Sequence, residues 1–424
     1  MLMRRLLEGD LALDDPDVGT HMDRCLGCRA CETACPSGVP YGHLLEATRA
    51  TMATTRRQPL VASLILAVFA RHWLLSIALF FARVFRWTRV PALLATVLPR
   101  RLAFPMAMLA STSRNRNLET SSRRSEVKPL AIPVAPRPSE AQPLAIPVAS
   151  IPSEAQPSAT PENPGPSEAK PVTAPTSERA TAVVLEGCVM RGLFAPINDA
   201  TKRVLAVNGF QLANAPAQTC CGALHAHAGH LDTARALARK NIAAFEASGA
   251  DLIAINSAGC GAMIKDYAHL LKDDEVWHSR AVSISAKARD VSELLAAAGP
   301  KVGDNTFHAR VTYDAPCHLM HAQRITREPI TVLSAIPGLD LVPLTDSDQC
   351  CGSAGIYNLI EPDTSDAVLA PKLARIAESG ASLVATGNPG CLMQIGAGLS
   401  LAGSSVRAIH PVELLDASYR TQSR

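Results

Sequence analysis

The chain has 424 residues, of which 47% are hydrophobic and 19% are charged, and it contains twelve cysteines. This length is sufficient for two or three domains, each with its own core. The formal net charge is only +3, which argues against nucleic acid as a partner. The first residues lack the apolar run and small-residue cleavage site of an export signal, so we expect a cytoplasmic protein whose cysteines bind metal or carry out redox chemistry.

The first group of cysteines lies near the start of the chain. Cys25, Cys28, Cys31 and Cys35, followed by Pro36, have the spacing C-x2-C-x2-C-x3-C-P of bacterial ferredoxin-type [4Fe-4S] sites. A zinc knuckle is the alternative, but zinc usually takes two separated cysteine pairs. We therefore predict a small α-helical ferredoxin-type domain over residues 1–50 that binds a [4Fe-4S] cluster.

The fourth ligand of this cluster is an open question. In two-cluster ferredoxins the last cysteine of each run binds the other cluster, so a pair of runs completes both sites. We expect Cys25, Cys28 and Cys31 to supply three ligands, and Cys35 to point toward a second cluster because the turn at Pro36 directs it away. The fourth ligand would then come from elsewhere, or from a run upstream of a truncated N-terminus.

The next segment, residues 51–118, is rich in arginine and apolar residues. From residue 47 to residue 118 there are eleven arginines and no Asp or Glu. The stretch 60–82 is long enough to span a bilayer, but Arg71 and His72 lie at its midpoint, where an arginine costs about 3 kcal/mol on insertion scales. We expect two helices that lie against a membrane surface or a partner. Core helices that pack on the ferredoxin-type domain are the alternative.

Residues 119–180 form a predicted disordered linker. The segment "PLAIPVAPRPSEAQ" at 129–142 recurs as "PLAIPVASIPSEAQ" at 143–156. Such Pro, Ala, Ser and Glu tracts cannot bury a core and behave as extended spacers.

The remaining eight cysteines form two matching sets beyond Thr181. The first set is Cys188, Cys220, Cys221 and Cys260, and the second is Cys317, Cys350, Cys351 and Cys391. A glycine follows each adjacent pair, and corresponding cysteines are 129, 130, 130 and 131 residues apart. This registry indicates an internal duplication, with one Cys-Cys-Gly module over 181–300 and a second over 301–424.

Both modules are predicted to have an α/β fold. The stretches 181–188, 251–260, 310–317 and 382–391 each have the pattern of a buried strand that ends at a cysteine. Helical patterns intervene, for example at 231–247 and 365–378. Strands that alternate with helices favour a parallel sheet, whose ligands gather at the carboxyl ends of the strands. Each module should therefore bring four thiols to one edge.

Four thiols at such an edge favour an iron-sulfur cluster, with a zinc site or a redox-active dithiol as alternatives. Adjacent cysteines diverge, so they can bind different irons of one cluster, and Gly222 and Gly352 would permit close backbone approach. Five histidines lie near the two edges, and we expect most of them to be surface or cap residues rather than ligands: His225, His227, His230, His318 and His321.

Several phrases of the sequence resemble a known family. "RCLGCRACETACPSGVPYGHLLE", "SAGCGAMIKDYAHLL" and "CCGSAGIY" are similar to the iron-sulfur subunit of bacterial glycolate oxidase, also called glycolate dehydrogenase. The resemblance covers residues 1–50 and 181–416. Related Cys-Cys-Gly subunits serve lactate utilisation, anaerobic glycerol-3-phosphate dehydrogenase and heterodisulfide reductase. Two features depart from these patterns: the family normally has two ferredoxin-type runs, and Met263 and Gln394 stand where heterodisulfide reductases have a further cysteine.

The resemblance implies an electron-transfer subunit. Flavin subunits that carry FAD would oxidise glycolate to glyoxylate and pass electrons through this chain to a membrane quinone or another acceptor. We expect no catalytic residue on this chain, and it has no Gly-rich dinucleotide fingerprint. A peripheral position on the inner face of the cytoplasmic membrane is compatible with this role. The alternatives are a subunit of another hydroxy-acid or glycerol-3-phosphate dehydrogenase, or a thiol enzyme that resembles heterodisulfide reductase.

Overall fold

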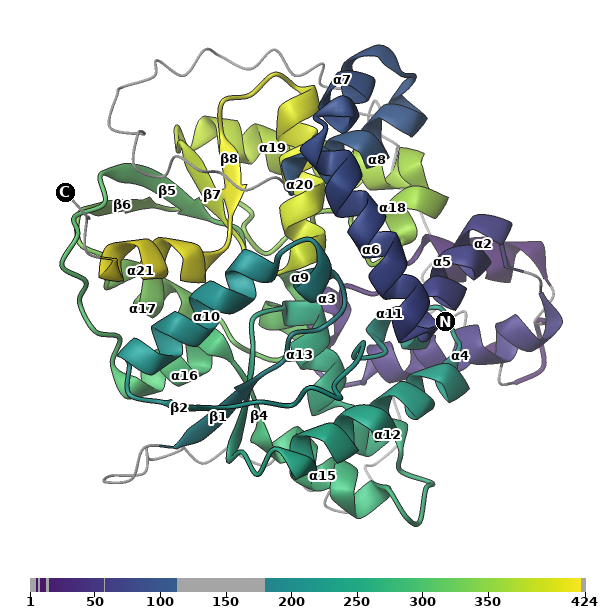
Figure 1. Cartoon of the computed structure of the whole chain (residues 1–424). Helices are drawn as coiled ribbons and strands as arrows, with labels where there is room; N and C mark the ends of the chain where they lie inside the picture. Colours follow the sequence, from purple (N-terminus) through teal and green to yellow (C-terminus); the bar gives the residue numbers. More distant parts are fainter. Residues whose placement is uncertain (1–4, 7, 13–14, 57, 113–179, 421–424) are drawn as a thin grey trace, which may run out of the picture.

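The structure, a computed structural model, describes residues 5–6, 8–12, 15–56, 58–112 and 180–420. Two α/β units lie side by side, and the helices that precede them in the sequence pack along one side of both (Figure 1). The predicted fold class, with an α-helical N-terminal part and two duplicated α/β modules, is confirmed. The predicted linker 119–180 lies outside the described residues except for residue 180.

The first α/β unit is built on a four-stranded parallel sheet of order β2-β1-β3-β4. Its central strands are buried on both faces, which explains their uninterrupted apolar sequences. The strands are β1 (Thr181–Val184), β2 (Gln211–Ala213), β3 (Leu252–Ile255) and β4 (Ala288–Asp290). The helices are α9 (Val189–Gly192), α10 (Ala195–Val207), α11 (Ala223–His227), α12 (Leu231–Ala247), α13 (Ala258–Lys265), α14 (Tyr267–Leu270), α15 (His278–Lys287) and α16 (Val291–Ala298). The helix predicted at 231–247 is α12.

The second unit repeats this topology in a sheet of order β6-β5-β7-β8, which supports the predicted duplication. Its strands are β5 (Ala309–Tyr313), β6 (Leu339–Val342), β7 (Leu383–Ala385) and β8 (Arg407–Ile409). Its helices are η1 (His318–Ala322), α17 (Glu328–Ser334), α18 (Tyr357–Ile360), α19 (Pro362–Glu378), α20 (Pro389–Leu401) and α21 (Pro411–Tyr419). The helix predicted at 365–378 begins three residues earlier, because Pro362 has the fixed φ that suits a first helical position.

The two units share a core. One cluster of buried side chains joins Val184 and Leu205 of the first unit to Val311 and Leu415 of the second. Helix α10 packs against α21 within this cluster. Because the units are joined through buried apolar surface, the edges that carry their cysteines are held in a fixed relation.

Within its described residues the ferredoxin-type region includes three helices that share a small core of their own. They are α2 (Pro16–Arg24), α3 (Ala30–Ala34) and α4 (Tyr41–Thr55). Val18, Met22, Leu45 and Met52 are buried together between α2 and α4. So few buried side chains contribute little stability, and this region also depends on its contacts with the two α/β units.

The arginine-rich segment forms four helices: α5 (Leu60–Ala70), α6 (His72–Trp87), α7 (Val90–Val97) and α8 (Arg100–Ser111). The chain bends by 108° between α5 and α6. Within the described residues no single helix has the length and apolar character to cross a bilayer, although this bent pair meets both criteria when taken together. Helix α8 packs mainly on α20, and helix α6 contacts α9. The main contacts of this segment are therefore with the α/β units, and not with the ferredoxin-type domain as the alternative predicted.

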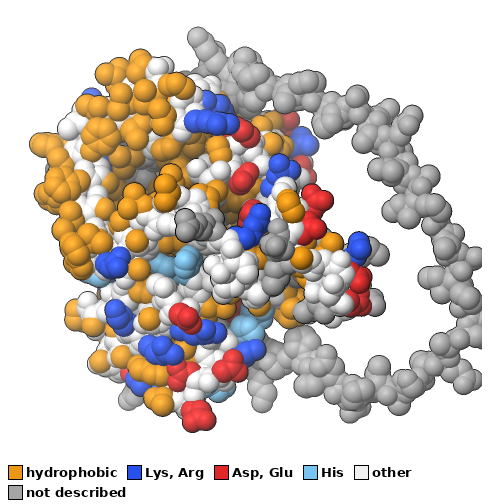
Figure 2. Space-filling model, turned by 90° about the vertical axis from the view of Figure 1, so that its right-hand side faces the viewer, with side chains coloured by type: hydrophobic (Ala, Val, Ile, Leu, Met, Phe, Trp, Pro, Cys, Tyr) orange, Lys and Arg blue, Asp and Glu red, His pale blue; other side chains and the backbone are white. Residues whose placement is uncertain are grey.

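These four helices leave a large apolar surface uncovered. Hydrophobic side chains cover the upper left of the face shown in Figure 2. Leu60 is 88% exposed and Trp87 83% exposed, whereas only Ala62, Leu66 and Leu75 are buried on α5 and α6. We call this the α5–α8 apolar surface, and its large exposed side chains are Leu60, Val61, Leu64, Trp73, Ile77, Phe80, Phe81, Val84, Trp87, Val90, Leu93, Val97 and Leu102.

Candidate iron-sulfur centres

The four cysteines of the first module lie beyond the carboxyl ends of its strands, as predicted. The expectation that strands run up to the cysteines is wrong, however, because β1 ends four residues before Cys188 and β3 ends five residues before Cys260. Cys260 instead lies in the first turn of α13. In the intervening turn Nδ2 of Asn256 donates to Asn198 and Thr201, while Oδ1 of the same side chain is buried without a hydrogen-bond partner among the described residues.

The adjacent cysteines of this module diverge toward different partners. Sγ of Cys220 is 3.6 Å from Sγ of Cys188, and Sγ of Cys221 is 3.3 Å from Sγ of Cys260. Gly222 permits this geometry, since its φ is +93° and a Cβ there would lie 3.3 Å from the backbone of α12. The predicted close backbone approach at this glycine is confirmed.

Two residues that the sequence did not single out hold the Cys220–Cys221 backbone. Asn241 accepts from the N–H of Thr219 and donates to the carbonyl of Cys220 at 2.9 Å. The hydroxyl of Tyr267, which is fully buried, donates to the carbonyl of Cys221 at 2.8 Å. Both side chains come from helices behind the loop, so the cysteine pair has a rigid support.

The electrostatic environment distinguishes the two cysteines of the pair. Hydrogen bonds from the thiols of Cys188 and Cys221 hold the pKa of Cys220 well below its usual value, and the N–H of Gly222 acts in the same direction. The hydrogen bond between Cys188 and Cys220 raises the pKa of Cys188, and burial of Cys188 raises it further. A thiolate is therefore favoured at Cys220, and thiolates are the ligands that iron and zinc require.

The second module repeats the arrangement. Sγ of Cys351 is 3.3 Å from Sγ of Cys391, and the thiol of Cys317 holds the pKa of Cys350 well below its usual value by hydrogen bonding to it. Gly352 has a φ of +86°, and a Cβ there would lie 2.6 Å from the carbonyl oxygen at the start of α19, so no larger residue fits. The Gly352 N–H points at Sγ of Cys350, 3.4 Å away.

The ferredoxin-type run lies against both modules. Arg49 of α4 donates to the carbonyl of Met22 on α2, to the carbonyl of Cys25 in the run and to the carbonyl of His227 in the first module. On the other side, Oγ1 of Thr33 is 2.9 Å from Nδ1 of the second module's His321. The structure therefore brings the predicted ferredoxin run to the junction of the two cysteine-bearing edges.

The thiols of the run differ in their surroundings. Burial raises the pKa of Cys28, and the nearby Cys350 adds to this shift, which places the run next to the second module's cysteine pair. Cys35 is instead the C-cap of α3, and backbone N–H groups of Val39 and Ser37 lower its pKa. Gly27 has the positive φ that the tight loop requires.

The histidines near the two edges mostly hold the N-terminal helices in place. Nε2 of His225 is 3.0 Å from the carbonyl of Leu66, and Nε2 of His230 is 2.9 Å from Oε1 of Gln58. His227 is paired through Nδ1 with Glu46, 2.8 Å away. The expectation of surface or cap residues holds for His230, the N-cap of α12, but is wrong for His225 and His321, which are buried. Their partners, far away in the sequence, could not be foreseen.

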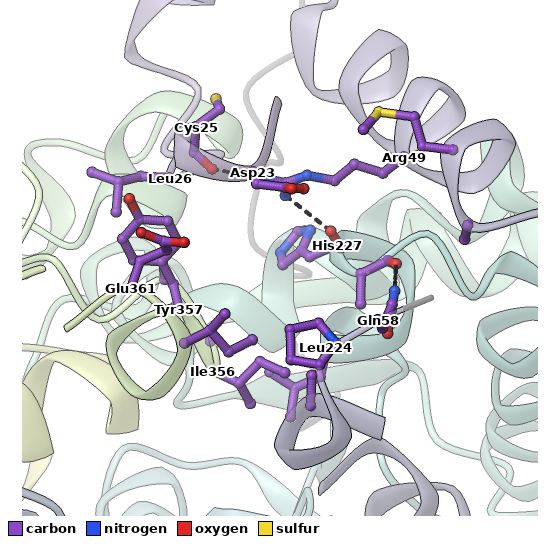
Figure 3. Close-up of a pocket in the computed structure, with 18 of the residues that line it drawn as sticks. Asp23, Cys25, Leu26, Arg49, Gln58, Leu224, His227, Ile356, Tyr357 and Glu361 are labelled. Carbon is purple, nitrogen blue, oxygen red and sulfur yellow. Dashed lines mark hydrogen bonds between the residues drawn. The ribbon is translucent and has the colours of Figure 1, made fainter. Parts of the chain in front are cut away.

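A cavity opens beside the run, between it and both modules (Figure 3). Its volume is about 350 Å³. The close-up shows Leu224 and Ile356 in its lower middle, Tyr357 and Glu361 at its left, and the ring of His227 near its centre. Cys25 is one of the lining residues, so the cavity adjoins the predicted ferredoxin site.

The cysteines fit iron-sulfur clusters by the chemistry of their donors. Each module presents four soft sulfur ligands, paired at two ends of a buried site, so different thiolates can reach different irons. Among the described residues, no three Cys, His, Asp or Glu side chains are arranged around one point in the manner of a single-ion site.

Comparison with known proteins identifies the same regions. Residues 19–41 match the model of the 4Fe-4S binding domain, and residues 182–265 and 311–396 match the model of the Cysteine-rich domain. The chain is 34% identical to the probable glycolate oxidase iron-sulfur subunit of Bacillus subtilis and 28% identical to the glycolate oxidase iron-sulfur subunit of Escherichia coli. Each match covers 98% of this chain and 86% of the relative. Lactate utilization protein A of Oceanobacillus iheyensis is 30% identical over 54% of this chain and 93% of the relative.

These matches agree with the geometry, since both kinds of iron-sulfur motif occur in the chain and the fold brings them together. The Bacillus subtilis match runs through the ferredoxin-type region and both modules, whereas the lactate utilization relative matches only about half of the chain. The chain therefore belongs to the family of glycolate oxidase iron-sulfur subunits.

Proposed function

We propose that this chain is the electron-transfer subunit of a glycolate dehydrogenase complex. Partner subunits that carry FAD oxidise glycolate to glyoxylate, and this chain conducts the electrons to an acceptor at the membrane. The observation that carries the proposal is the meeting of three cysteine groups at one junction, tied together by Arg49 and by the contact of Thr33 with His321. The names of the Bacillus subtilis and Escherichia coli relatives support glycolate as the substrate.

All twelve cysteines are proposed cluster ligands. Cys25, Cys28 and Cys31 hold a [4Fe-4S] cluster, and Cys35 faces a second one. The two modules each hold one further iron-sulfur cluster, through Cys188, Cys220, Cys221 and Cys260 in the first and Cys317, Cys350, Cys351 and Cys391 in the second. When bound, these clusters supply the one-electron steps. The protein supplies their positions, through Asn241, Tyr267 and the glycines after each pair.

The proposed functional units follow the sequence divisions. They are a ferredoxin-type domain at 1–50, the helical segment at 51–118 and two modules at 181–300 and 301–424. In this division the two modules have matching sheets, and the ferredoxin-type run, which contacts both modules, belongs to a separate unit.

The α5–α8 apolar surface is the proposed contact with the membrane. Its apolar side chains are suited to the boundary between headgroups and acyl chains, and the exposed Arg71 and Arg89 can pair with anionic headgroups. Residues 47–118 contain no Asp or Glu, so no carboxylate of this segment repels anionic headgroups. The 108° bend between α5 and α6 supports helices that lie on the membrane.

A second candidate function is the oxidation of lactate, which the lactate utilization relative favours. Lactate and glycolate are both 2-hydroxy acids that differ by one methyl group. Since the substrate binds on the flavin partner in either case, this chain would have the same electron-transfer role.

The test is reconstitution of the complex without air. The chain is co-purified with the flavin subunits encoded beside it, and reduction of an artificial dye is followed with glycolate and with lactate. We expect glycolate-dependent dye reduction by the complex and none by the chain alone. Activity in the isolated chain would refute the subunit assignment, and a preference for lactate would select the second candidate.

A further inference from the structure

The two modules share one fold, but they differ at two positions close to their cysteines. Directly after the first cysteine, the first module has Val189 and the second has His318. Three residues before the last cysteine, the first module has Ser257 and the second has Asn388. At both positions the second module has a side chain with an N–H group and the first module has one without. The surroundings of the two proposed clusters are therefore chemically unequal.

The side chain of Asn388 connects a sulfur of the second module to the backbone of the first. Its Nδ2 is 3.5 Å from Sγ of Cys391, and its Oδ1 accepts from the N–H of Gly259 at 3.2 Å. Because a backbone N–H can only donate, the amide oxygen must face Gly259 and the NH₂ group must face the sulfur. Asn388 is the N-cap of α20 but makes no side-chain capping bond to that helix, so its amide is available for both contacts.

The ring of His318 lies against the first cysteine of the second module. Its Nδ1 is 3.5 Å from Sγ of Cys317, and its Nε2 is buried without a hydrogen-bond partner among the described residues. A neutral imidazole carries one N–H group. A proton on Nε2 would leave a buried donor unpaired and would turn the lone pair of Nδ1 toward a thiolate. The N–H group is therefore on Nδ1, where it donates to the sulfur of Cys317.

The first module has no counterpart of these two donors within the described residues. Val189 packs against the core that the two modules share, and Ser257 makes no side-chain capping bond at the start of α13. His225 lies near Cys220, but its Nε2 donates to the carbonyl of Leu66, so in the neutral ring Nδ1 has only a lone pair and cannot donate to a thiolate. The glycine N–H after each cysteine pair acts alike in both modules and does not distinguish them.

The loops that lead to the last cysteine of each module are in direct contact. The N–H of Ala258 donates to the carbonyl of Gly387 at 3.1 Å, beside the bond from Gly259 to Asn388. Gln323, the C-cap of η1, donates to the carbonyl of Ala258 at 2.9 Å. An electron can therefore pass between the modules inside the protein, across loops that are held in a fixed relation.

We propose that the cluster of the second module has the higher reduction potential and that electrons pass from the first module to the second. Asn388 and His318 are the positioning residues that set this difference, since they direct N–H groups at thiolate sulfurs. This inference rests on the proposed function, in which each module holds one cluster, and it adds the order in which electrons visit the modules.

The direction of the electron flow follows from charge. Reduction adds one negative charge to the iron and its sulfur ligands, so an N–H donor to sulfur stabilises the reduced form more than the oxidised form and raises the potential. One electron leaves the first module, which is oxidised, and enters the second, which is reduced, with no bond broken and no proton moved. The flavin partner that oxidises the hydroxy acid is the reductant, and the acceptor of the complex takes the electron from the second module.

The first test is a redox titration of the full chain, loaded with iron and sulfide without air and followed by electron paramagnetic resonance. Cys221→Ser and Cys351→Ser, which each remove a ligand of one module, identify the signal that belongs to each cluster. We expect the signal of the second module to be reduced at a potential at which that of the first module is still oxidised. Equal potentials, or a higher potential in the first module, would refute the order.

The second test replaces each donor by the residue that the first module has. At a fixed potential, Asn388→Ser and His318→Val should each lower the ratio of reduced to oxidised cluster in the second module tenfold, which is about 59 mV for a one-electron couple. The potential of the first module should not change. Asn208→Ser is the control, because its amide donates to Val204 and Tyr419 and not to sulfur, and it should shift neither signal. No shift in the two test variants, or an equal shift of both signals, contradicts the proposal.

Iron per chain, measured in every sample, separates this inference from the proposed function. A variant with the iron content of wild type has assembled its clusters, so a changed potential in it is not a folding effect. Asn388→Ser and His318→Val act on different cysteines, so either variant alone decides the question if the other loses its iron. Wild-type modules that hold iron at equal potentials keep the proposed function and lose this order, whereas wild-type modules that hold no iron overturn both.

Discussion

The ammonium of Lys372 lies 3.0 Å from the carboxylate of Asp314, and the two side chains are only 1% and 2% exposed. Lys372 also donates to the carbonyls of Asp346 and Ser347. Asp314 follows β5, and the 346–347 turn precedes the cysteine pair at Cys350. The buried lysine therefore connects the end of the central strand to the loop that presents the second module's cysteines.

Removal of this lysine should be strongly destabilising. Lys372→Met leaves the Asp314 carboxylate buried without its partner, which should lower the free energy of unfolding by about 3–5 kcal/mol in chemical denaturation. Lys202→Met is the matched control, because the Lys202–Glu186 pair is about one-third exposed and should contribute about 0–1 kcal/mol. A similar loss in both variants would show that burial of the ion pair is not the cause.

The buried imidazole of His410 predicts a dependence of stability on pH. Nδ1 accepts from the N–H of Val412, Nε2 donates to the carbonyl of Asn256 in the other module, and burial lowers the pKa of His410 to about 4. The unfolded chain therefore binds this proton more readily. The stability that His410 contributes is fully present above pH 6.5 and falls by about 3 kcal/mol as the pH drops to 4.

The test compares pH profiles of wild type and His410→Gln. Burial raises the pKa of Asp290 to about 6, which acts with the opposite sign in the same window, so the difference between the two proteins is the informative quantity. We expect the difference in free energy of unfolding to shrink as the pH falls from 7 to 4. A difference that is constant with pH would show that the imidazole does not titrate as described.

Protein purified without air should be brown and contain iron and sulfide. Cys28→Ala should lose about one [4Fe-4S] equivalent, because it removes a ligand of the run. Cys35→Ala should retain the cluster held by its three neighbours. Iron and sulfide analysis, with the optical and electron paramagnetic resonance spectra, checks both variants. If Cys35→Ala abolishes a stable four-iron cluster, then Cys35 itself closes the site.

Arg49 should control how firmly the ferredoxin-type run is attached. A lysine cannot reproduce a planar fork that donates to the carbonyls of Met22, Cys25 and His227. Arg49→Lys should speed the loss of the run's iron to a chelator several-fold while the melting of the α/β units changes little. Arg280→Lys, in an exposed pair with Glu246, is the control. Unchanged iron release would show that the run is held by its other contacts.

Binding to lipid should depend on both charge and apolar contact. Full-length protein should sediment with vesicles of anionic lipid at low salt and less so at 1 M salt, where the screening length falls to about 3 Å. Leu60→Asp together with Leu93→Asp should reduce binding several-fold. Val302→Asp, an exposed apolar residue away from these helices, should have little effect. If the Val302→Asp variant loses as much vesicle binding as the double variant, the α5–α8 apolar surface is not a specific membrane contact.

Much of the fold could be predicted because its signals are local. The duplication follows from cysteine registry, and the helix at 231–247 follows from its apolar period and was located to the residue. Strand ends were less accurate, since the polar turns between Val184 and Cys188, or between Ile255 and Cys260, read as part of the strand.

The long-range contacts could not be predicted. Nothing in the sequence indicates that Arg49 of α4 binds a carbonyl of the first module, or that His410 bonds to Asn256. Met263 and Gln394, which stand in place of cysteines, proved to be buried. Met263 lies in the first module's core, and Gln394 bonds to Asn358 and Ser365. Such partners are separated by many residues, and only the packing of the whole chain brings them together.

The position of the ferredoxin-type run has a consequence for biosynthesis. Thr33 meets His321 across 288 residues, and the Arg24 carbonyl meets Tyr357 across 333. A ribosome makes the run before its docking surfaces, because His227 belongs to the first module and His321 and Tyr357 belong to the second. During that interval its thiols are open to oxidation and to the wrong metal. The cell must therefore keep this segment reduced, or load its iron only after the rest of the chain has folded around it.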